Sequence, residues 1–133
     1  MEKPVNYLFV YGTLMRGHNN SFAEKLHSLC DFEGNGYFSG LLYRIGWYPG
    51  AVYDSKSHFK VHGEIYKIQD SQDLIAELDD YEDVFEDESA SLYVRRTISV
   101  TKADGSIVDC WVYLYNQSVA DLSQIGSGSF WDV

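Results

Sequence analysis

The sequence predicts an α+β fold, a small mixed but mainly antiparallel β-barrel with about two short helices. Strand-like runs outnumber helix-like runs, and Val, Ile, Tyr and Phe stand at alternating positions within them. The 133 residues are 45% hydrophobic and 16% aromatic, with only two Pro, so the chain is expected to fold. Many strands with few helices favour a sheet that curls into a barrel, which leaves a mouth for a ligand. We expect one domain over residues 1–133.

The first expected strand is Tyr7 to Tyr11, a continuous apolar run that stops at Gly12. Such a run is typical of a strand buried on both faces and ended by a turn. Two helices are expected. The first follows a cap at Asn20 or Ser21 and carries Phe22, Ala23, Leu26 and Leu29, and the second runs from Ser71 to about Glu82.

The remaining expected strands are separated by clusters of Gly, Asp and Ser. They are Tyr37 to Tyr43, Ala51 to Tyr53, Lys60 to Ile68, Leu92 to Thr101 and Ile107 to Tyr115. The segment Lys102 to Ser106 contains an Asp-Gly pair and predicts a hairpin between the last two strands. The composition of Glu33 to Gly36 predicts a turn.

The negative charge is concentrated in one segment. Of the 20 acidic residues ten lie between Asp70 and Glu88, where there is no Lys or Arg, and the other 114 residues hold ten acids and ten bases. The formal charge of −10 therefore belongs to this segment. No part of the chain has the surplus of positive charge that nucleic-acid binding needs, so we expect no nucleic-acid partner.

Cys30 and Cys110 are isolated, which predicts two small core residues in a reducing compartment and no disulfide or zinc site. No run approaches the 18 or so apolar residues of a transmembrane helix, and the N-terminal run is too short for a signal peptide. We therefore expect a cytoplasmic protein without a membrane partner.

One acidic side chain of the second expected helix is predicted to face the protein interior. On a helical wheel with Leu78 at zero, Leu74 falls near −40°, Ile75 near 60° and Tyr81 near −60°, which defines the core-facing side. Glu82 falls near 40°, within this side, whereas the other acids of the helix, Asp73, Glu77, Asp79, Asp80 and Asp83, lie about 100° or more from Leu78. Desolvation and like-charge repulsion are both expected to raise the pKa of Glu82.

A carboxyl whose pKa is raised toward neutrality suits general acid–base catalysis. The alternative is a structural ion pair of Glu82 with Arg44, Arg95 or Arg96. The wheel does not decide between the two.

The turn Tyr11-Gly12-Thr13-Leu14 follows a strand and precedes a helix, so its consecutive N–H groups could bind an anion. The alternative is a turn without a ligand, because neither a phosphate loop nor a dinucleotide fingerprint is present. His58 and His62 lie in a loop and strand, where the i,i+4 spacing does not bring them together, so no metal site is expected. No GxSxG motif supports a nucleophilic Ser.

The strand from Leu92 contains two arginines on opposite faces. Arg96 shares one face with Val94 and Ile98, and Arg95 shares the other with Tyr93. Either arginine could line a pocket. The strand tyrosines, among them Tyr43, Tyr53, Tyr66, Tyr113 and Tyr115, are expected to pack the barrel and to find hydroxyl partners there.

Taken together, several short motifs resemble the γ-glutamylcyclotransferase family, in particular its γ-glutamylamine cyclotransferase and AIG2-like branch. They occur in the family's order and, with the tail from Gly126 to Trp131, cover nearly the whole chain. The motifs are Tyr11-Gly12-Thr13-Leu14 with Met15-Arg16-Gly17, Tyr48-Pro49-Gly50-Ala51-Val52, Val61-His62-Gly63-Glu64-Ile65-Tyr66, Leu78-Asp79-Asp80-Tyr81-Glu82 and Tyr93-Val94-Arg95.

The resemblance implies a cyclotransferase-type barrel and a reaction without a cofactor or metal. The α-amino nitrogen of a small γ-glutamyl substrate attacks its own γ-carbonyl, which releases 5-oxoproline and a free amine. By motif, Glu82 is the acid/base, and the substrate-binding residues are Tyr11, Gly12, Thr13, Leu14, Arg16, Tyr93 and Arg95. The backbone of the loop would bind the anionic end of the substrate or the developing oxyanion.

The chain departs from the family at Asp83, where a Gly often follows the catalytic Glu. The leaving amine, the oligomeric state and the individual roles of Arg16, Arg95 and Arg96 are left open. A second hypothesis is also kept: a non-catalytic module with the same fold that binds a small molecule or docks a basic partner through its acidic face.

Overall fold

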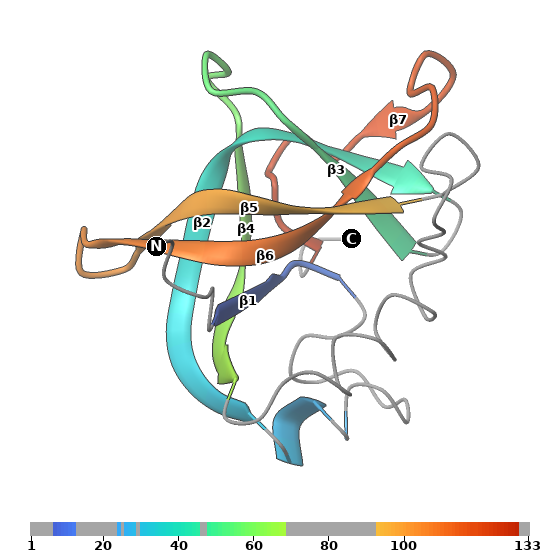
Figure 1. Cartoon of the computed structure of the whole chain (residues 1–133). Helices are drawn as coiled ribbons and strands as arrows, with labels where there is room; N and C mark the ends of the chain where they lie inside the picture. The colour runs from blue at the N-terminus through green and yellow to red at the C-terminus, as the bar shows by residue number, and fades with distance from the viewer. Residues whose placement is uncertain are drawn as a thin grey trace.

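The computed structural model describes residues 7–12, 24, 26–28, 30–45, 48–68 and 93–130. Seven strands are present in this part of the chain (Figure 1). They are β1 (Tyr7–Val10), β2 (Cys30–Ile45), β3 (Tyr48–Tyr53), β4 (Lys60–Ile68), β5 (Tyr93–Lys102), β6 (Ile107–Tyr115) and β7 (Ser123–Gln124). Residues 24 and 26–28 are helical. The expected helix from Ser71 to Glu82, with the whole acidic segment, lies outside the described residues.

The predicted mixed barrel is confirmed. Hydrogen bonding follows the order β3-β2-β4-β1-β6-β5, and an additional pairing of β2 with β5 closes a ring of five strands. All pairings are antiparallel except that of β1 with β6, which is parallel. Figure 1 shows how the long β2 curves, with the β5–β6 pair crossing in front of it.

The turn predicted for Glu33 to Gly36 is wrong, because these residues continue β2. The register of β2 against β4 shifts between Phe32 and Gly34, which marks a β-bulge. Gly34 has a φ of 128°, a backbone conformation open to glycine. The turn-like residues therefore bend a strand rather than end one.

The hairpin between β5 and β6 is confirmed. The Lys102 N–H donates to the Ser106 carbonyl at 2.8 Å, and Gly105 has a φ of 89°. The Asp104 carboxylate accepts the Ser106 N–H at 2.9 Å and the Ser106 hydroxyl at 2.6 Å. These hydrogen bonds hold the pKa of Asp104 below its usual value.

Two hydrophobic clusters cover the two faces of the sheet. The interior cluster contains alternate residues of the strands: Phe9, Tyr11, Phe38, Leu42, Ala51, Val61, Ile65, Val94, Ile98, Val100, Cys110, Val112 and Leu114. The outer cluster includes Leu26 of the helical piece with Leu8, Val10, Cys30, Tyr66, Ile68, Tyr93 and Tyr113. Since β1 contributes to both clusters, the prediction that it is buried on both faces is confirmed.

Both cysteines are buried and free, as expected of small core residues. Burial, helped by the carboxylate of Asp109, raises the pKa of Cys110 to about 12. Burial and Asp31 raise the pKa of Cys30 to about 11. Both thiols are therefore protonated at neutral pH.

No helix among the described residues has the length and apolar character needed to span a membrane.

Candidate active site

Four strand ends gather at one end of the barrel. Since β1 runs parallel to β6, the two strands end at the same side, and β5, antiparallel to β6, begins there. The Ala51 N–H donates to the Tyr11 hydroxyl and the Tyr93 hydroxyl donates to the Pro49 carbonyl, which brings the first residues of β3 to the same place. This end therefore unites the Tyr11-Gly12 turn, the Pro49-Gly50-Ala51 segment and the start of β5.

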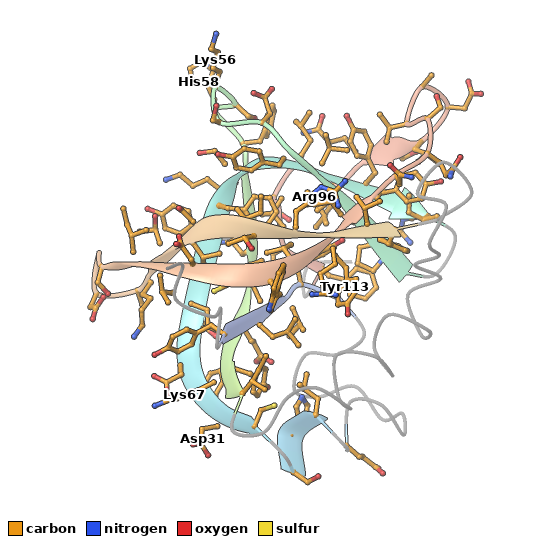
Figure 2. The ribbon with its side chains drawn as sticks, viewed as in Figure 1. Asp31, Lys56, His58, Lys67, Arg96 and Tyr113 are labelled. Atoms are coloured by element: carbon orange, nitrogen blue, oxygen red, sulfur yellow. The ribbon has the colours of Figure 1, made fainter. Side chains whose placement is uncertain are left out.

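The Tyr11 side chain joins two strands across the barrel interior. Its hydroxyl donates to the carbonyl oxygen of Tyr113 on β6 and accepts the N–H of Ala51 on β3 at 3.2 Å. Tyr113 lies 102 residues from Tyr11 in the sequence, and Figure 2 shows Tyr113 beside β6. The hydroxyl of Tyr11 therefore holds β6 and β3 together. The part of this residue that suits a ligand is its backbone.

Gly12 lies against the ring of Pro49. A Cβ at position 12 would be 2.8 Å from Cγ and 2.9 Å from Cδ of this proline, closer than real Cβ atoms come. Glycine is therefore required for the close approach of the turn to β3. The Tyr11-Gly12 and Tyr48-Pro49-Gly50-Ala51 motifs, which are far apart in the sequence, form one packed unit.

Tyr93 fixes the other side of the same segment. Its buried hydroxyl donates to the carbonyl oxygen of Pro49 at 2.7 Å, and its ring packs edge-to-face on Tyr115 with the centroids 5.7 Å apart. A Cβ on Gly50 would lie 2.8 Å from Cβ of Tyr115. Both the Pro49 carbonyl and Gly50 are thus held by aromatic residues of β5 and β6. A contact of Tyr93 with substrate stays a prediction.

The two arginines of β5 lie on opposite faces, as the alternation predicts. The Arg95 guanidinium is 4.4 Å from the centroid of the Trp111 ring, a cation–π contact on the face that carries Tyr93. Arg96 is exposed, and its Nη1 donates to the Arg95 carbonyl at 3.0 Å. Figure 2 shows Arg96 and Tyr113 on opposite sides of the β5–β6 pair. Of the two, Arg95 shares the face of Tyr93.

Four of the predicted site residues are described: Tyr11, Gly12, Tyr93 and Arg95. The structure brings the first three together at the β3 segment, whereas Arg95 contacts Trp111. Thr13, Leu14, Arg16 and the proposed acid/base Glu82 lie outside the described residues, as does Asp83. Within the described part of the chain, no group of three or more His, Cys, Asp or Glu side chains is placed to hold a metal ion.

Sequence reasoning did not assign a site role to Pro49, Trp111 or Tyr113. The only signal was the Tyr-Pro-Gly-Ala motif, whose Pro49-Gly50 pair stands directly before the expected strand Ala51 to Tyr53; the structure includes this pair in β3. The partners of the tyrosine hydroxyls, a carbonyl 44 residues away for Tyr93 and one 102 residues away for Tyr11, could not be read from the sequence.

Comparison with known proteins identifies this arrangement. The sequence pattern of the family described as gamma-glutamyl cyclotransferase, AIG2-like, matches residues 8–132. The chain belongs to this family. The match includes the turn after β1, the β3 segment and the start of β5, which form the packed unit described above.

Two relatives match most of this chain. The gamma-glutamylcyclotransferase family protein YtfP of Escherichia coli is 32% identical over 126 residues, which cover 94% of this chain and 96% of YtfP. A Niallia circulans protein named gamma-L-glutamyl-butirosin B gamma-glutamyl cyclotransferase is 30% identical over 112 residues, covering 83% and 67% of the two chains.

The fold is also found among solved structures of AIG2-like proteins. The crystal structure of a mouse AIG2-like protein superposes with a TM-score of 0.73 at 29% identity, covering 96% of this chain and 89% of the mouse chain. The solution structure of E. coli YtfP gives a TM-score of 0.65 at 31% identity, with 95% and 96% covered. The predicted cyclotransferase-like barrel is thereby confirmed.

Proposed function

We propose that the protein is a cyclotransferase that converts a γ-glutamyl amine or γ-glutamyl peptide to 5-oxoproline and a free amine. The observation that carries the proposal is the packing of Gly12 on Pro49, within a family match that spans residues 8–132. This packing holds the backbone of the turn, whose N–H groups suit an anionic substrate group or an oxyanion.

The reaction forms one bond and breaks one. The α-amino nitrogen attacks the γ-carbonyl carbon, a five-membered ring closes, and the bond from this carbon to the leaving nitrogen breaks. The attacking ammonium loses a proton and the leaving nitrogen gains one, so a single carboxyl can accept and return it. We assign this role to Glu82, on the basis of its inward position on the helical wheel and its place in the family motif.

Ring closure is intramolecular, so the main task of the protein is to hold the folded conformer of the substrate. Reactions oriented in this way reach effective molarities of about 10⁵ M or more. The backbone at Tyr11, Gly12, Thr13 and Leu14 is proposed to bind the substrate, with Arg16, Tyr93 and Arg95 as further contacts. No cofactor is needed for this chemistry.

The class of substrate is suggested by a relative. The Niallia circulans protein is named as acting on γ-L-glutamyl-butirosin B, a γ-glutamyl group on an amine. We therefore propose a γ-glutamyl amide as substrate and leave the leaving amine to experiment. The buried, free Cys30 and Cys110 support a reducing, cytoplasmic location.

The test is the release of 5-oxoproline from γ-glutamyl-ε-lysine, γ-glutamyl-alanine and glutathione. We expect turnover of at least one, and a loss of about 10²-fold or more in kcat for Glu82→Gln. Asp79→Asn is the control, since it also removes one charge but stands on the solvated side of the wheel. No product from any substrate, or full activity of Glu82→Gln, contradicts the proposal.

The alternative, a non-catalytic module, predicts a different result. It is favoured by 5-oxoproline binding without turnover, together with salt-sensitive association with a basic partner. That association should be lost when Asp79, Asp80 and Asp83 are neutralised, because the attraction comes from the acidic segment.

A further inference from the structure

Glu64 is a buried acid that the proposed reaction does not use. Its side chain is 2% exposed, on the outer face of β4, the face that carries Tyr66 and Ile68 of the outer cluster. Burial of a carboxylate is unfavourable by several kcal/mol unless hydrogen bonds or a counter-charge compensate it. The Tyr66 hydroxyl supplies one such bond, to Oε1 of Glu64 at 2.9 Å.

Tyr66 is itself held in place. The side chain is 1% exposed, and its ring stacks on His27 with the centroids 5.2 Å apart and the planes at 16°. Phe32 packs against the same ring at 5.6 Å. The hydroxyl therefore has a fixed direction, and so does the carboxylate oxygen that accepts from it.

Glu64 lies next to the strand end that leads into the candidate site. Its direct partner across the β1–β4 pair is Val10, the last residue of β1, and directly opposed side chains in such a pair have Cβ atoms about 4.5–5.5 Å apart. The neighbouring Gly63 is so close to β1 that a Cβ would lie 2.2 Å from the Val10 carbonyl oxygen. Tyr11 and Gly12 follow directly. Glu64 therefore packs beside the strand end that determines the position of the Tyr11 and Gly12 backbone.

We propose that Glu64, oriented by Tyr66, is a positioning residue that fixes the end of β1 and, through it, the backbone N–H groups of Tyr11 and Gly12. The kinetic part of this inference rests on the proposed function. Displacing a binding group by about 1 Å can lower a rate by about 10²-fold. A rigid carboxylate–phenol pair behind the strand end prevents such a displacement.

The experiment uses two variants of the pair and a matched control. Glu64→Gln keeps the shape of the side chain but replaces an acceptor oxygen by a donor, and Tyr66→Phe removes only the hydroxyl. Ile68→Val is the control, since it weakens the same outer cluster but removes no hydrogen-bonding group from the pair. Backbone order parameters of Val10, Tyr11 and Gly12 are measured by NMR relaxation, and kcat and KM are measured separately.

We expect both pair variants to lower the order parameters of Tyr11 and Gly12 from about 0.85 toward 0.6. We also expect them to lower kcat about tenfold or more, with a smaller change in KM. Ile68→Val should change neither by more than about twofold. Folded variants with unchanged order parameters and kcat overturn the proposal. If Glu64→Gln does not fold, Tyr66→Phe decides.

The two proposals fail in distinguishable ways. Absence of 5-oxoproline from the wild-type protein contradicts the cyclotransferase function, and the order parameters alone then decide whether Glu64 positions the turn. Turnover by the wild type with unaffected pair variants contradicts only the role of Glu64.

Discussion

The Tyr93 hydroxyl donates a 2.7 Å hydrogen bond to the carbonyl oxygen of Pro49, 44 residues away in the sequence. This bond attaches the start of β3 to the start of β5, while the Tyr11 hydroxyl attaches the Ala51 N–H two residues later. Gly12 packs on the Pro49 ring between these two bonds. The geometry of the turn after β1 therefore depends on two hydroxyl groups, that of Tyr93 at the start of β5 and that of Tyr11 in the turn itself.

Removing the Tyr93 hydroxyl should weaken both the fold and the site. Tyr93→Phe leaves the Pro49 carbonyl without this donor, so we expect a loss of about 1–3 kcal/mol in the free energy of unfolding. We also expect a lower kcat/KM for 5-oxoproline release. Tyr115→Phe is the control, because it removes a hydroxyl from the ring that packs on Tyr93. Equal effects of the two variants would contradict the role of the Pro49 bond.

Adding a methyl group at position 12 should separate the turn from β3. Gly12→Ala places a Cβ 2.8 Å from Cγ of Pro49, and we expect about 1–3 kcal/mol of destabilisation with a marked loss of activity. Gly126→Ala, where a Cβ meets nothing within 4 Å, should change neither. Urea unfolding and the 5-oxoproline assay measure both. Wild-type activity in Gly12→Ala would show that the close approach is not needed.

A second glycine, Gly128, packs the C-terminal segment closely against β4. Gly128 has a φ of 71°, its carbonyl accepts the His62 N–H at 2.8 Å, and a Cβ would lie 1.6 Å from the Lys60 carbonyl oxygen. We expect Gly128→Ala to lose more than about 3 kcal/mol, since conformational strain of about 1 kcal/mol adds to the clash.

Gly105→Ala separates the conformational strain from the clash. Its φ is 89°, but nothing lies within 4 Å of a Cβ there, so the expected loss is about 1 kcal/mol. Denaturant unfolding of both variants measures the difference. Similar losses would mean that the contact with Lys60 is relieved by a small shift of the backbone.

Arg95 and Arg96 should differ in their effect on substrate binding. Arg95 lies over Trp111 on the face that carries Tyr93, whereas Arg96 is exposed. We expect Arg95→Met to raise KM about tenfold, as the loss of about 1.4 kcal/mol of charge-assisted binding would do. Arg96→Met should leave KM near the wild-type value. If both variants have wild-type KM values, neither arginine binds substrate.

The buried thiols predict a loss of stability at alkaline pH. The pKa values of Cys30 and Cys110 are raised to about 11 and 12, above the value of 9.0 expected in an unfolded chain. Above pH 9 the unfolded chain releases these protons while the folded protein keeps them. The free energy of unfolding therefore falls as pH rises from 9 toward 12.

The contribution of the thiols is isolated by replacing them. Urea unfolding of the wild type at pH 8 and pH 10 should show a larger decrease than that of the Cys30→Ala, Cys110→Ala double variant. Each thiol should also react slowly with a disulfide reagent at pH 8, because the thiolate is the reactive form. Fast reaction of the folded protein would contradict their burial.

The sequence by itself determined most of the secondary structure and the family. Alternating apolar residues predicted β4 and β6 at their observed bounds, the Asp104-Gly105 pair predicted the hairpin, and the continuous apolar run predicted a first strand buried on both faces. These features depend on neighbouring residues, whose spacing fixes which face of a strand is buried.

Only the tertiary structure decided the closure of the barrel by β2 and β5, the continuation of β2 through Gly34 and the partners of the buried tyrosines. A bulge and a glycine-rich turn have the same composition, so the partner strand decides between them. A tyrosine hydroxyl bonds whichever carbonyl the fold brings near, and for Tyr11 that carbonyl is 102 residues away. The same reason explains Glu64: its sequence position places it on a strand face, but only the tertiary structure shows that its side chain is buried and accepts a hydrogen bond from Tyr66.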